Sequence, residues 1–599
     1  MLHLSILLWL PLAVGLLGLL APKRAARWVA LVGGLLAVAL SVAFVLDFDS
    51  GSGLLQHVTS DAWIEAFGVR YDLALTGLNV WLILLTTVGF AFATGWLATT
   101  DDGRGDRARQ LFLHFGIAQT AVIGALLSQD VILFIAFFDL MLIPFFFLTV
   151  MFGNGDRVPA VIKMVVYTLV GSLLMLVAAV AIGVLSTPDG QPISFSIQTI
   201  AERGVPEGSQ GWLFACFAAA FLVKMPSFPF HGWLADGYKA MPLPVLAVFS
   251  GVLSKVAAYG FLLIALPLLP EGVADLRWVV LIMAVISILY GSLIALTTTN
   301  ARLVLAYSSV AQLGFITLGV FSLRTDGATG ALLQSVNHGV AVFGAFLAVA
   351  ILSQRAGGSE DLRDMGGIAT KAPIFAVFFV IVTYAVLALP GTANFLGEIL
   401  ILRGLWEGPS VALAVVASLG IALAAVYALR LFILSSHNRV GPQAEPREAS
   451  KAQLALLAVP VVLIIALAIH PQQTIRAADA AATQAVYPAA AVVDPVAAEQ
   501  MAQEAARYRN CTGWSCFRSA PPAASDGAEV PGGTGGVPPE DIAIDPSTGQ
   551  PVAPQGAAPD QGAAGEGEEI VIDENGEVVG DDEEMVIEED AQTIEGTNR

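Results

Sequence analysis

The sequence places five ionisable side chains near the middle of long apolar runs, each on a different run: Asp139, Lys224, Lys255, His338 and Glu398. Burying such a group in hydrocarbon costs several kcal/mol, so these residues usually face the interior of a helix bundle and mark the path of an ion. Carboxylates, amines and imidazole can pass a proton stepwise, because each changes its charge as its neighbour does. The set therefore indicates proton movement across a membrane.

Each of these residues also has a static interpretation. Asp139 and Lys224 could form an ion pair that only holds two helices together. His338 alone is more often a hydrogen-bonded core residue. Lys255 could extend to the membrane surface, but it lies roughly 18 Å of helix rise from either end of its run. Five such groups on five runs exceed what helix packing requires, which favours the proton path.

Two of the five runs are interrupted by proline beside the charge. Pro226 follows Lys224 by two residues, and Pro390 precedes Glu398 by eight. Proline inside a helix removes a backbone hydrogen bond, and the freed carbonyls can hold water or an ammonium group. The breaks fall in the seventh and twelfth runs, and matching breaks in two halves of a transporter indicate an inverted repeat.

The elements that carry these residues follow from the hydrophobic pattern. Hydrophobic residues make up 56% of the 599-residue chain and charged residues only 13%, against about 25% charged in an ordinary soluble domain. This composition excludes a soluble enzyme, a disordered protein and a nucleic-acid binder. Fourteen apolar runs are long enough to cross a bilayer: 2–20, 28–46, 75–98, 110–128, 131–151, 159–186, 211–230, 243–269, 276–297, 301–322, 328–353, 372–404, 410–433 and 452–470. The expected fold is an all-α polytopic membrane protein.

Alternate connections between these runs are basic, and the others are mostly acidic. Lys23, Arg24 and Arg27 lie in the first connection, whereas Asp47 and Asp49 lie in the second. The positive-inside rule places the basic set in the cytoplasm. Fourteen crossings then predict that both termini are extracytoplasmic.

Nearly all of the formal net charge of −20 falls in residues 472–599, which carry −19. This segment combines like charges with few large apolar groups, so we expect a disordered acidic extracytoplasmic tail. Cys511 and Cys516 lie within it, and their spacing permits a disulfide without requiring one.

Several segments resemble a known membrane family. They are FDLMLIPFFFL, KMPSFPFHGWLAD, LAYSSVAQLGF, NHGV and LPGTANFLGEILIL. Over about residues 1–470 the chain resembles the antiporter-like, proton-pumping membrane subunits of respiratory complex I, which are related to Mrp-type sodium/proton antiporter subunits. A glutamate after the GTANF break is typical of one subunit type, where the related L and N subunits and the Mrp antiporters carry lysine.

The resemblance implies about fourteen transmembrane helices with two five-helix inverted repeats and broken helices 7 and 12. The expected divisions are residues 1–108 for the first three helices, 109–270 and 271–435 for the repeats, 436–471 for the last helix and 472–599 for the tail.

The resemblance also implies a role for each candidate residue. Asp139 takes the place of the carboxylate that pairs with Lys224, Lys255 is the central lysine, His338 follows it, and Glu398 is the exit acid. The supporting residues are His231, Gln312, Pro226 and Pro390. The chain departs from the family at three positions: Asp139 replaces a glutamate and has a shorter reach, Gln312 stands where relatives often have histidine, and Tyr238 replaces another histidine.

The implied function is that of a subunit of an NADH:quinone oxidoreductase, in which quinone reduction elsewhere drives proton translocation through this chain. We expect no cofactor, metal or redox centre here, since NADH, FMN, iron–sulfur clusters and quinone belong to partner subunits. The expected partners are L-, N- and K-like chains, the bilayer, protons and water, with no nucleic acid. The expected location is the bacterial inner membrane. The alternatives are an Mrp-type cation/proton antiporter subunit, which the glutamate disfavours, and a membrane scaffold, which the buried charges disfavour.

Overall fold

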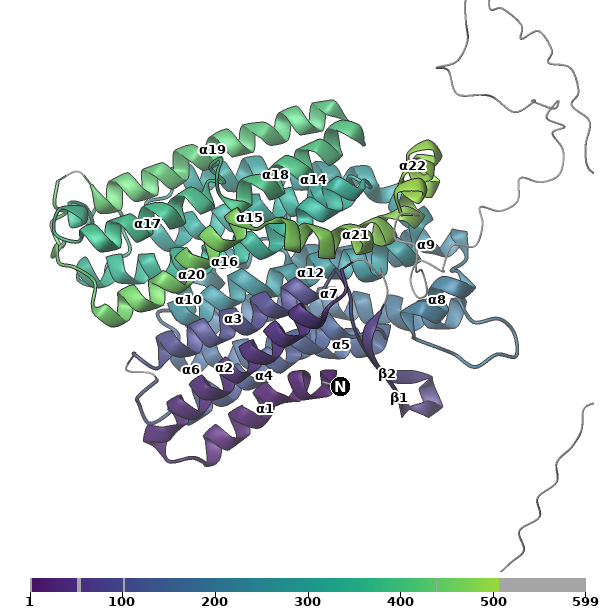
Figure 1. Cartoon of the computed structure of the whole chain (residues 1–599), viewed down its shortest axis with the longest axis horizontal. Coiled ribbons are helices and arrows are strands. Elements are labelled where there is room, and N and C mark those ends of the chain that lie inside the picture. Colours follow the sequence, from purple (N-terminus) through teal and green to yellow (C-terminus); the bar gives the residue numbers. More distant parts are fainter. Residues whose placement is uncertain (1–2, 51–54, 101–102, 438, 506–599) are drawn as a thin grey trace, which may run out of the picture. The chain divides into compact units, whose positions relative to one another are not determined.

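The computed structural model describes residues 3–505 except 51–54, 101–102 and 438 (Figure 1). The prediction of disorder for residues 506–599, and the question of a Cys511–Cys516 disulfide, lie outside the described residues.

The helices of the first half follow the predicted runs closely. They are α1 (Leu4–Leu20), α2 (Lys23–Asp47), α3 (Val80–Leu97), α4 (Ala108–Leu127), α5 (Val131–Leu140), α6 (Leu142–Phe152), α7 (Arg157–Leu185), α8 (Ile197–Arg203), α9 (Glu207–Lys224), α10 (Leu234–Ala240), α11 (Leu243–Val248), α12 (Ser254–Gly260) and α13 (Leu266–Leu268). The predicted eighth span consists of α11 to α13, joined by π-helical turns at Phe249–Leu253 and Phe261–Ala265.

The second half is equally regular. Its helices are α14 (Pro270–Thr297), α15 (Ala301–Phe321), α16 (Thr325–Arg355), α17 (Pro373–Val386), α18 (Ala393–Glu407), α19 (Val411–Ser436) and α20 (Lys451–Ile469). Eleven helices of the described chain are long and apolar enough to span a membrane, and α1 and α17 are shorter apolar helices. The polytopic helical fold is confirmed, whereas the division into two inverted repeats stays a prediction.

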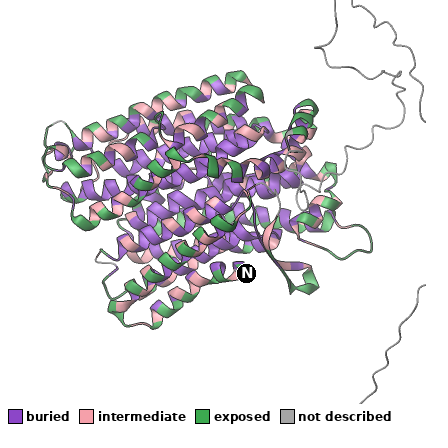
Figure 2. Ribbon diagram, viewed as in Figure 1, coloured by how far each residue is buried: buried purple, intermediate pink, exposed green. Residues whose placement is uncertain are grey.

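The centre of the bundle is α16, whose apolar window is buried along its entire length (Figure 2). It packs against α15, α17, α18 and α20 and also touches α3 and α11 of the first half. Outer helices expose large aliphatic side chains instead, such as Val177 on α7 and Leu419 on α19. This pattern is typical of a bundle whose rim faces lipid and whose interior is closed.

Contacts between connecting segments divide them into two sets at opposite ends of the bundle. In one set Lys23 pairs with Asp106 at 2.5 Å, and Arg302 donates to the Met241 carbonyl at 2.6 Å. In the other set Asp130 forms a β-bridge with Ser196. The first set contains the basic connections, so the alternation predicted from charge is present in the fold.

One connection contains a β-hairpin that the sequence did not reveal. Strand β1 (Gln56–Ile64) pairs antiparallel with β2 (Val69–Leu75). Gly68 ends the turn with φ +69°, and a Cβ there would lie 2.0 Å from the Ile193 carbonyl oxygen. The exposed side chains of β1 mix polar residues (Ser60, Asp61) with apolar ones (Val58, Trp63), so the strand lacks the alternation that predicts a half-buried strand.

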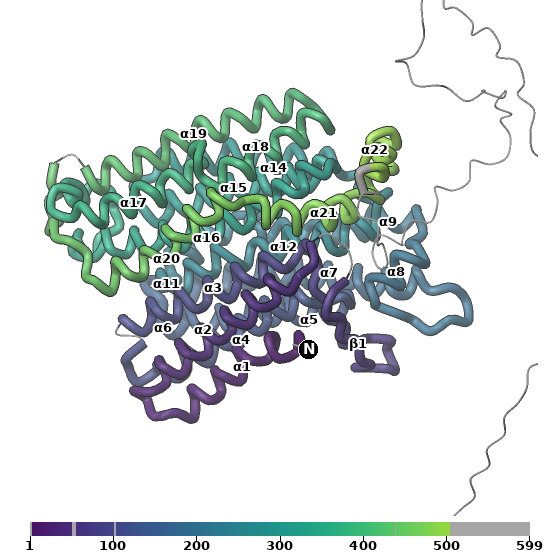
Figure 3. The backbone as a smooth tube through the Cα atoms, viewed as in Figure 1, coloured from purple at the N-terminus to yellow at the C-terminus, as the bar shows by residue number. Residues whose placement is uncertain are grey.

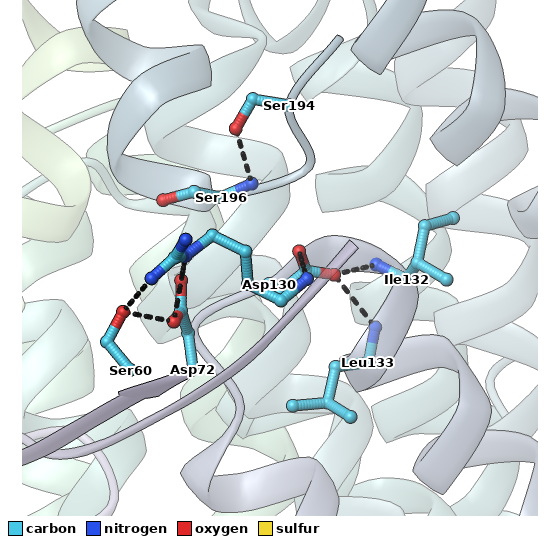
Figure 4. A network of polar contacts seen from close by, with 8 residues as sticks. Ser60, Asp72, Asp130, Ile132, Leu133, Ser194 and Ser196 are labelled. Atoms are coloured by element: carbon cyan, nitrogen blue, oxygen red, sulfur yellow. Dashed lines mark hydrogen bonds and ion pairs between the residues drawn. The ribbon is translucent and has the colours of Figure 1, made fainter. Parts of the chain in front are cut away.

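A polar network fastens this hairpin to the start of α5 (Figure 4). Asp130 is fully buried, and its carboxylate accepts from the N–H groups of Ile132 at 2.9 Å and Leu133 at 3.0 Å, as a helix N-cap does. Its second oxygen accepts from the Arg70 N–H at 3.1 Å. The Arg70 side chain pairs with Asp72 at 3.2 Å. The network therefore ties the hairpin, α5 and the 194–196 segment together.

This network predicts a pH-dependent stability. Burial raises the pKa of the Asp130 carboxyl to about 6, although the three N–H groups oppose the rise. Folding thus binds a proton between the unfolded pKa of about 3.9 and the folded value. The protonated form stabilises the fold at pH below about 4, and this contribution is lost as the pH rises through 6. Thermal unfolding measured from pH 4 to pH 7 should show a steeper fall in Tm for the natural chain than for Asp130→Asn.

The matched control is Asp189→Asn, at an exposed carboxylate in another connection. The quantity to compare is the change of Tm with pH. The asparagine of the Asp130→Asn variant can still cap α5, and a loss of stability that is the same at every pH does not alter this slope. Equal slopes for all three proteins would show that Asp130 does not titrate in this range.

The segment after α20 corrects the sequence prediction. Residues 472–505 were expected to be disordered, but they form α21 (Gln472–Val493) and α22 (Pro495–Ala505), and the chain can be followed from α20 into both in Figure 3. A face of alanines, including the fully buried Ala482 and Ala489, packs on α13, α14 and α16. Alanine has the highest helix propensity but adds little hydropathy, so this amphipathic face is inconspicuous in composition.

Polar contacts fix α21 and α22 at the ends of the core helices. Thr329 on α16 donates to Asp479 at 3.2 Å. Asp494, between α21 and α22, pairs with Arg324 at 2.5 Å and accepts from the Ala497 N–H at 3.2 Å. The alanine face also allows close backbone approach, because a Cβ on Gly77 would lie 1.8 Å from the Ala477 carbonyl oxygen.

If α21 is docked through this face, an acid on it should release the helix. We predict that Ala482→Glu accelerates trypsin cleavage after Arg476 at least about tenfold, because an unpaired buried charge costs more than about 1.4 kcal/mol. Val492→Glu, at a position that is 37% exposed, should leave the rate near that of the natural chain. Cleavage is followed by mass spectrometry in detergent. Equal rates for the two variants would mean that α21 is not held by its alanine face.

Candidate functional site

The first pair of predicted residues lies where α5 and α9 end. Asp139, in the last turn of α5, accepts a hydrogen bond from the Ser172 hydroxyl on α7. Lys224, the last residue of α9, donates through Nζ to the Phe138 carbonyl, and Nζ lies 3.4 Å from the centroid of the Phe138 ring. Asp139 acts on Lys224 electrostatically, but the described chain contains no direct ion pair between them. This arrangement agrees with the shorter reach of aspartate.

The helix break after Lys224 is present as predicted. Pro226 cannot continue α9, and the chain resumes as helix only at Leu234. Three carbonyls at the end of α9 have donors beyond the helix: those of Phe221 and Leu222 accept from backbone N–H groups, and that of Val223 accepts from Trp233 Nε1 at 3.2 Å. His231 lies in this break against Tyr290, with ring centroids 4.9 Å apart. Its Nδ1 is buried and has no hydrogen-bond partner among the described residues.

Lys255 lies at the centre of the eighth span and is 1% exposed. Its Nζ donates to the Ser250 carbonyl at 2.7 Å and to the Ser254 hydroxyl at 3.2 Å. The Ser250 hydroxyl lies 3.3 Å from that of Ser309 on α15. Ser250 belongs to the first π-helical turn, and such turns are frequent at functional sites. The turn therefore gives Lys255 a carbonyl partner at Ser250, and the Ser250 hydroxyl in turn faces Ser309 of the second half.

Glu398, which is 1% exposed, is held by two amides. Its Oε1 accepts from Gln312 Nε2 on α15 at 2.9 Å and from Gln334 Nε2 on α16 at 3.5 Å. Gln334 Nε2 also donates to Gln312 Oε1 at 2.6 Å. Glu398 Oε2 and Gln334 Oε1 are buried acceptors without a protein donor among the described residues. Two such acceptors can share a donated proton or a bridging water, which suits a proton-transfer site.

His338 lies one helical turn after Gln334 on α16 and is 2% exposed. Lys255 acts on it electrostatically, and its Nδ1 has no hydrogen-bond partner in the described chain. The neighbouring Asn337 donates to the Ala393 carbonyl at 2.8 Å, at the first residue of α18. That contact secures the helix end created by the break at Pro390, which separates α17 from α18 as predicted.

The structure thus brings the predicted residues into three clusters. The Asp139–Lys224 pair and the Lys255 group are the first two, and the third joins Glu398 to Gln312 through direct hydrogen bonds. Lys255 and Glu398 are hydrogen-bonded to the other members of their clusters, whereas Asp139 and Lys224 bond different groups and not each other. In the described chain no hydrogen bond between protein atoms joins one cluster to the next. The sequence reasoning missed Ser172, Ser250, Ser309 and Gln334. Of these four residues, only Gln334 could have been found from the sequence, because its spacing of four from His338 places both on one face of a helix.

Comparison with known proteins places this geometry in a family. A family model described as the transmembrane region of NADH:quinone oxidoreductase/Mrp antiporters matches residues 128–424, which contain all five predicted path residues. Subunit M of the NADH-quinone oxidoreductase of Rhodobacter capsulatus is 33% identical over 445 residues, which cover 72% of this chain and 85% of that protein. The chain belongs to the subunit M family of NADH-quinone oxidoreductases.

Solved structures agree with this assignment. A chain of respiratory complex I from Thermus thermophilus matches with a TM-score of 0.74 and 28% identity, over 81% of this chain and all of that chain. A chain of the Mrp complex from Dietzia sp. matches with a TM-score of 0.71 and 21% identity, over 83% of this chain and 98% of that chain. The second likeness shows the fold alone. The resemblance to the antiporter-like family is therefore confirmed, and the protein is a multi-pass membrane protein.

In this member of the subunit M family, a contact between glycines brings the Glu398 cluster together. A Cβ on Gly397 would lie 2.7 Å from Gln334 Oε1 and 3.0 Å from the Gln334 backbone nitrogen. A Cβ on Gly330, one turn before Gln334, would lie 2.8 Å from the Gly397 carbonyl oxygen. The two glycines let α16 and α18 approach closely enough for Gln334 to reach both Gln312 and Glu398.

This close approach predicts that alanine substitution affects stability differently at two helix glycines. Gly397→Ala should destabilise the fold by about 1–3 kcal/mol, because the added methyl group overpacks a closed interior. Gly208→Ala on α9, where a Cβ meets nothing within 4 Å, should be neutral or stabilise by up to about 1 kcal/mol. The measurement is the denaturant midpoint of the purified protein in detergent. Equal midpoints for the two variants would show that the α16–α18 interface is loose.

Proposed function

We propose that this chain is the proton-translocating membrane subunit of an NADH-quinone oxidoreductase, in which quinone reduction by partner subunits drives protons through the buried residues described above. The observation that carries the proposal is the Glu398 cluster: a fully buried carboxylate, placed after a helix break and held by two amides. Membership of the subunit M family indicates the complex to which this chain belongs. Its NADH, FMN, iron–sulfur clusters and quinone act in partner subunits, and its L-, N- and K-like chains are the membrane neighbours.

The route begins at Asp139 and Lys224. When Asp139 contacts Lys224 the ammonium keeps its proton, and when Asp139 turns to Ser172 the ammonium can release it, because burial disfavours an unpaired charge. The carbonyl and ring of Phe138 hold Lys224 in the separated arrangement. Ser172 is therefore the alternative partner that makes the contact switchable.

From Lys224 the proton passes to Lys255, then through His338 to Glu398 and out. Bridging waters complete the steps between clusters, because buried polar sites with unpaired acceptors are where ordered water binds. Gln312 and Gln334 do not titrate. They hold Glu398 Oε1 and leave Oε2 as the atom that accepts and releases the proton.

The second candidate is an Mrp-type cation/proton antiporter subunit, favoured by the likeness of the fold to the Mrp complex. Glu398 argues against it, since the resemblance implies lysine at this point in those antiporters. Sodium uptake into vesicles driven by a pH gradient, without NADH, separates the two functions. The antiporter would show it, and the proposed subunit would not.

We place the protein in the bacterial inner membrane with both termini outside. The basic connections gather at one end of the bundle and α21 at the other, so the positive-inside rule puts α21 in the extracytoplasmic space. A reporter that is active only in the cytoplasm should be silent when fused after Arg599 and active when inserted at Gly441, in a basic connection. The reverse pattern would contradict this orientation.

Substitutions along the route should uncouple the assembled complex. Asp139→Asn, Lys224→Ala and Glu398→Gln should each stop proton translocation through this chain and slow NADH oxidation, whereas Asp139→Glu should be tolerated. The measurement is proton uptake per NADH oxidised in reconstituted vesicles, with assembly verified on native gels.

Matched controls are Lys163→Ala, which removes an exposed lysine paired with Asp236 at 2.9 Å, and Glu207→Gln at the exposed start of α9. Both should retain the parent stoichiometry. If Asp139→Asn and Lys224→Ala also retain it, the two residues have only a structural role and the route is wrong.

A further inference from the structure

An apolar groove of about 530 Å³ runs between α2, α3 and α20 on the rim of the bundle. All of its lining residues are Leu, Val, Ala, Phe or Gly. Its volume falls within the range of sites that bind small molecules. The groove opens outward, since Leu35 is 55% exposed and Val462 is 60% exposed. An elongated apolar ligand therefore fits it.

The register of the three helices fixes where the groove begins and ends. At one end a Cβ on Gly95 of α3 would lie 3.4 Å from a methyl group of Leu456 and 3.8 Å from one of Leu31, so these three residues are level. From there the lining continues along α20 to Leu463. The stretch of α20 from Leu456 to Leu463 spans about 10 Å of helix rise, roughly a third of the hydrocarbon thickness of a bilayer. The groove thus lies within a single leaflet.

Two basic side chains lie one helical turn beyond the lining residues at the Gly95 end of the groove. Arg27 precedes Leu31 by four residues on α2, and Lys451 precedes Ala455 by four on α20, so both lie on the faces that line the groove. Arg27 Nε is buried with no hydrogen-bond partner among the described residues. The Arg27 guanidinium lies 5.2 Å from the ring centroid of Trp28, and Trp28 is 55% exposed. Basic and aromatic residues of this kind mark the level of lipid headgroups.

We propose that this groove is a binding site for an anionic phospholipid. One acyl chain lies along α2 and α20 over Gly95, and the phosphate binds between Arg27 and Lys451. The charge at the mouth favours a lipid over a transmembrane helix of a partner subunit, because an apolar helix would leave the Arg27 donor unpaired. The site does not depend on the proton route.

Photo-crosslinking in the assembled complex tests the proposal. Nanodiscs contain either phosphatidylglycerol or phosphatidylcholine with a diazirine on the acyl chain, and adducts are mapped by mass spectrometry. The phosphatidylglycerol probe should label residues 31–38 and 455–463 several times more strongly than the exposed face of α7 around Val177. The phosphatidylcholine probe should label the groove and α7 equally.

Two kinds of variant separate charge from shape. Arg27→Gln and Lys451→Gln should each lower groove labelling by phosphatidylglycerol about fivefold and leave α7 labelling unchanged. Val459→Trp should block the groove for both probes, and because Val459 is 41% exposed the fold can accommodate it. Absence of label in the groove, as when a partner helix covers it, or equal labelling by both lipids, would overturn the proposal.

Discussion

The cost of an unpaired charge in a low-dielectric interior is the constraint on which this structure depends. Lys255 and Glu398 lie at the centre of a closed helix bundle, and each has partners that a regular helix would not provide. Lys255 has the carbonyl of a π-helical turn and a hydroxyl. Glu398 has two amides brought close by facing glycines on α16 and α18. The irregular features of the fold therefore occur where the charges are, and the uninterrupted helices around them close the interior.

The same constraint explains why partners are incomplete where movement is required. A fully paired charge would be stable and immobile, whereas Glu398 retains one acceptor oxygen without a protein donor and His338 retains one free ring nitrogen within the described chain. Asp139 and Lys224 contact different groups and not each other. Asp139 accepts from a serine hydroxyl, and Lys224 contacts a carbonyl and an aromatic ring. Such alternative partners lower the cost of separating the pair, which a switch needs and a structural ion bridge does not.

The sequence predicted the parts of the fold that depend on long apolar runs and on proline. The apolar helices and the breaks after Lys224 and around Pro390 were predicted because hydropathy and backbone chemistry are local. The hairpin at residues 56–75 and helix α21 were missed for the opposite reason. The hairpin depends on pairing between strands, and α21 depends on an alanine face that fits a surface invisible in the sequence. Gln334 was missed because an uncharged amide in an apolar run does not indicate an ion path. Its contacts with Gln312 and Glu398 depend on the close approach of α16 to α18.

The central claim is that three buried clusters form one series route, and a double substitution tests it most directly. Lys255→Met removes the middle charge without adding bulk, and Gln334→Leu removes the amide that orients Glu398. The measurement is the rate of NADH-driven proton translocation in vesicles for each single variant and for the double variant, at matched assembly. In a series route the double variant should be no slower than the slower single variant, because a second block adds nothing. If the two losses multiply, the clusters act independently and the single route is contradicted.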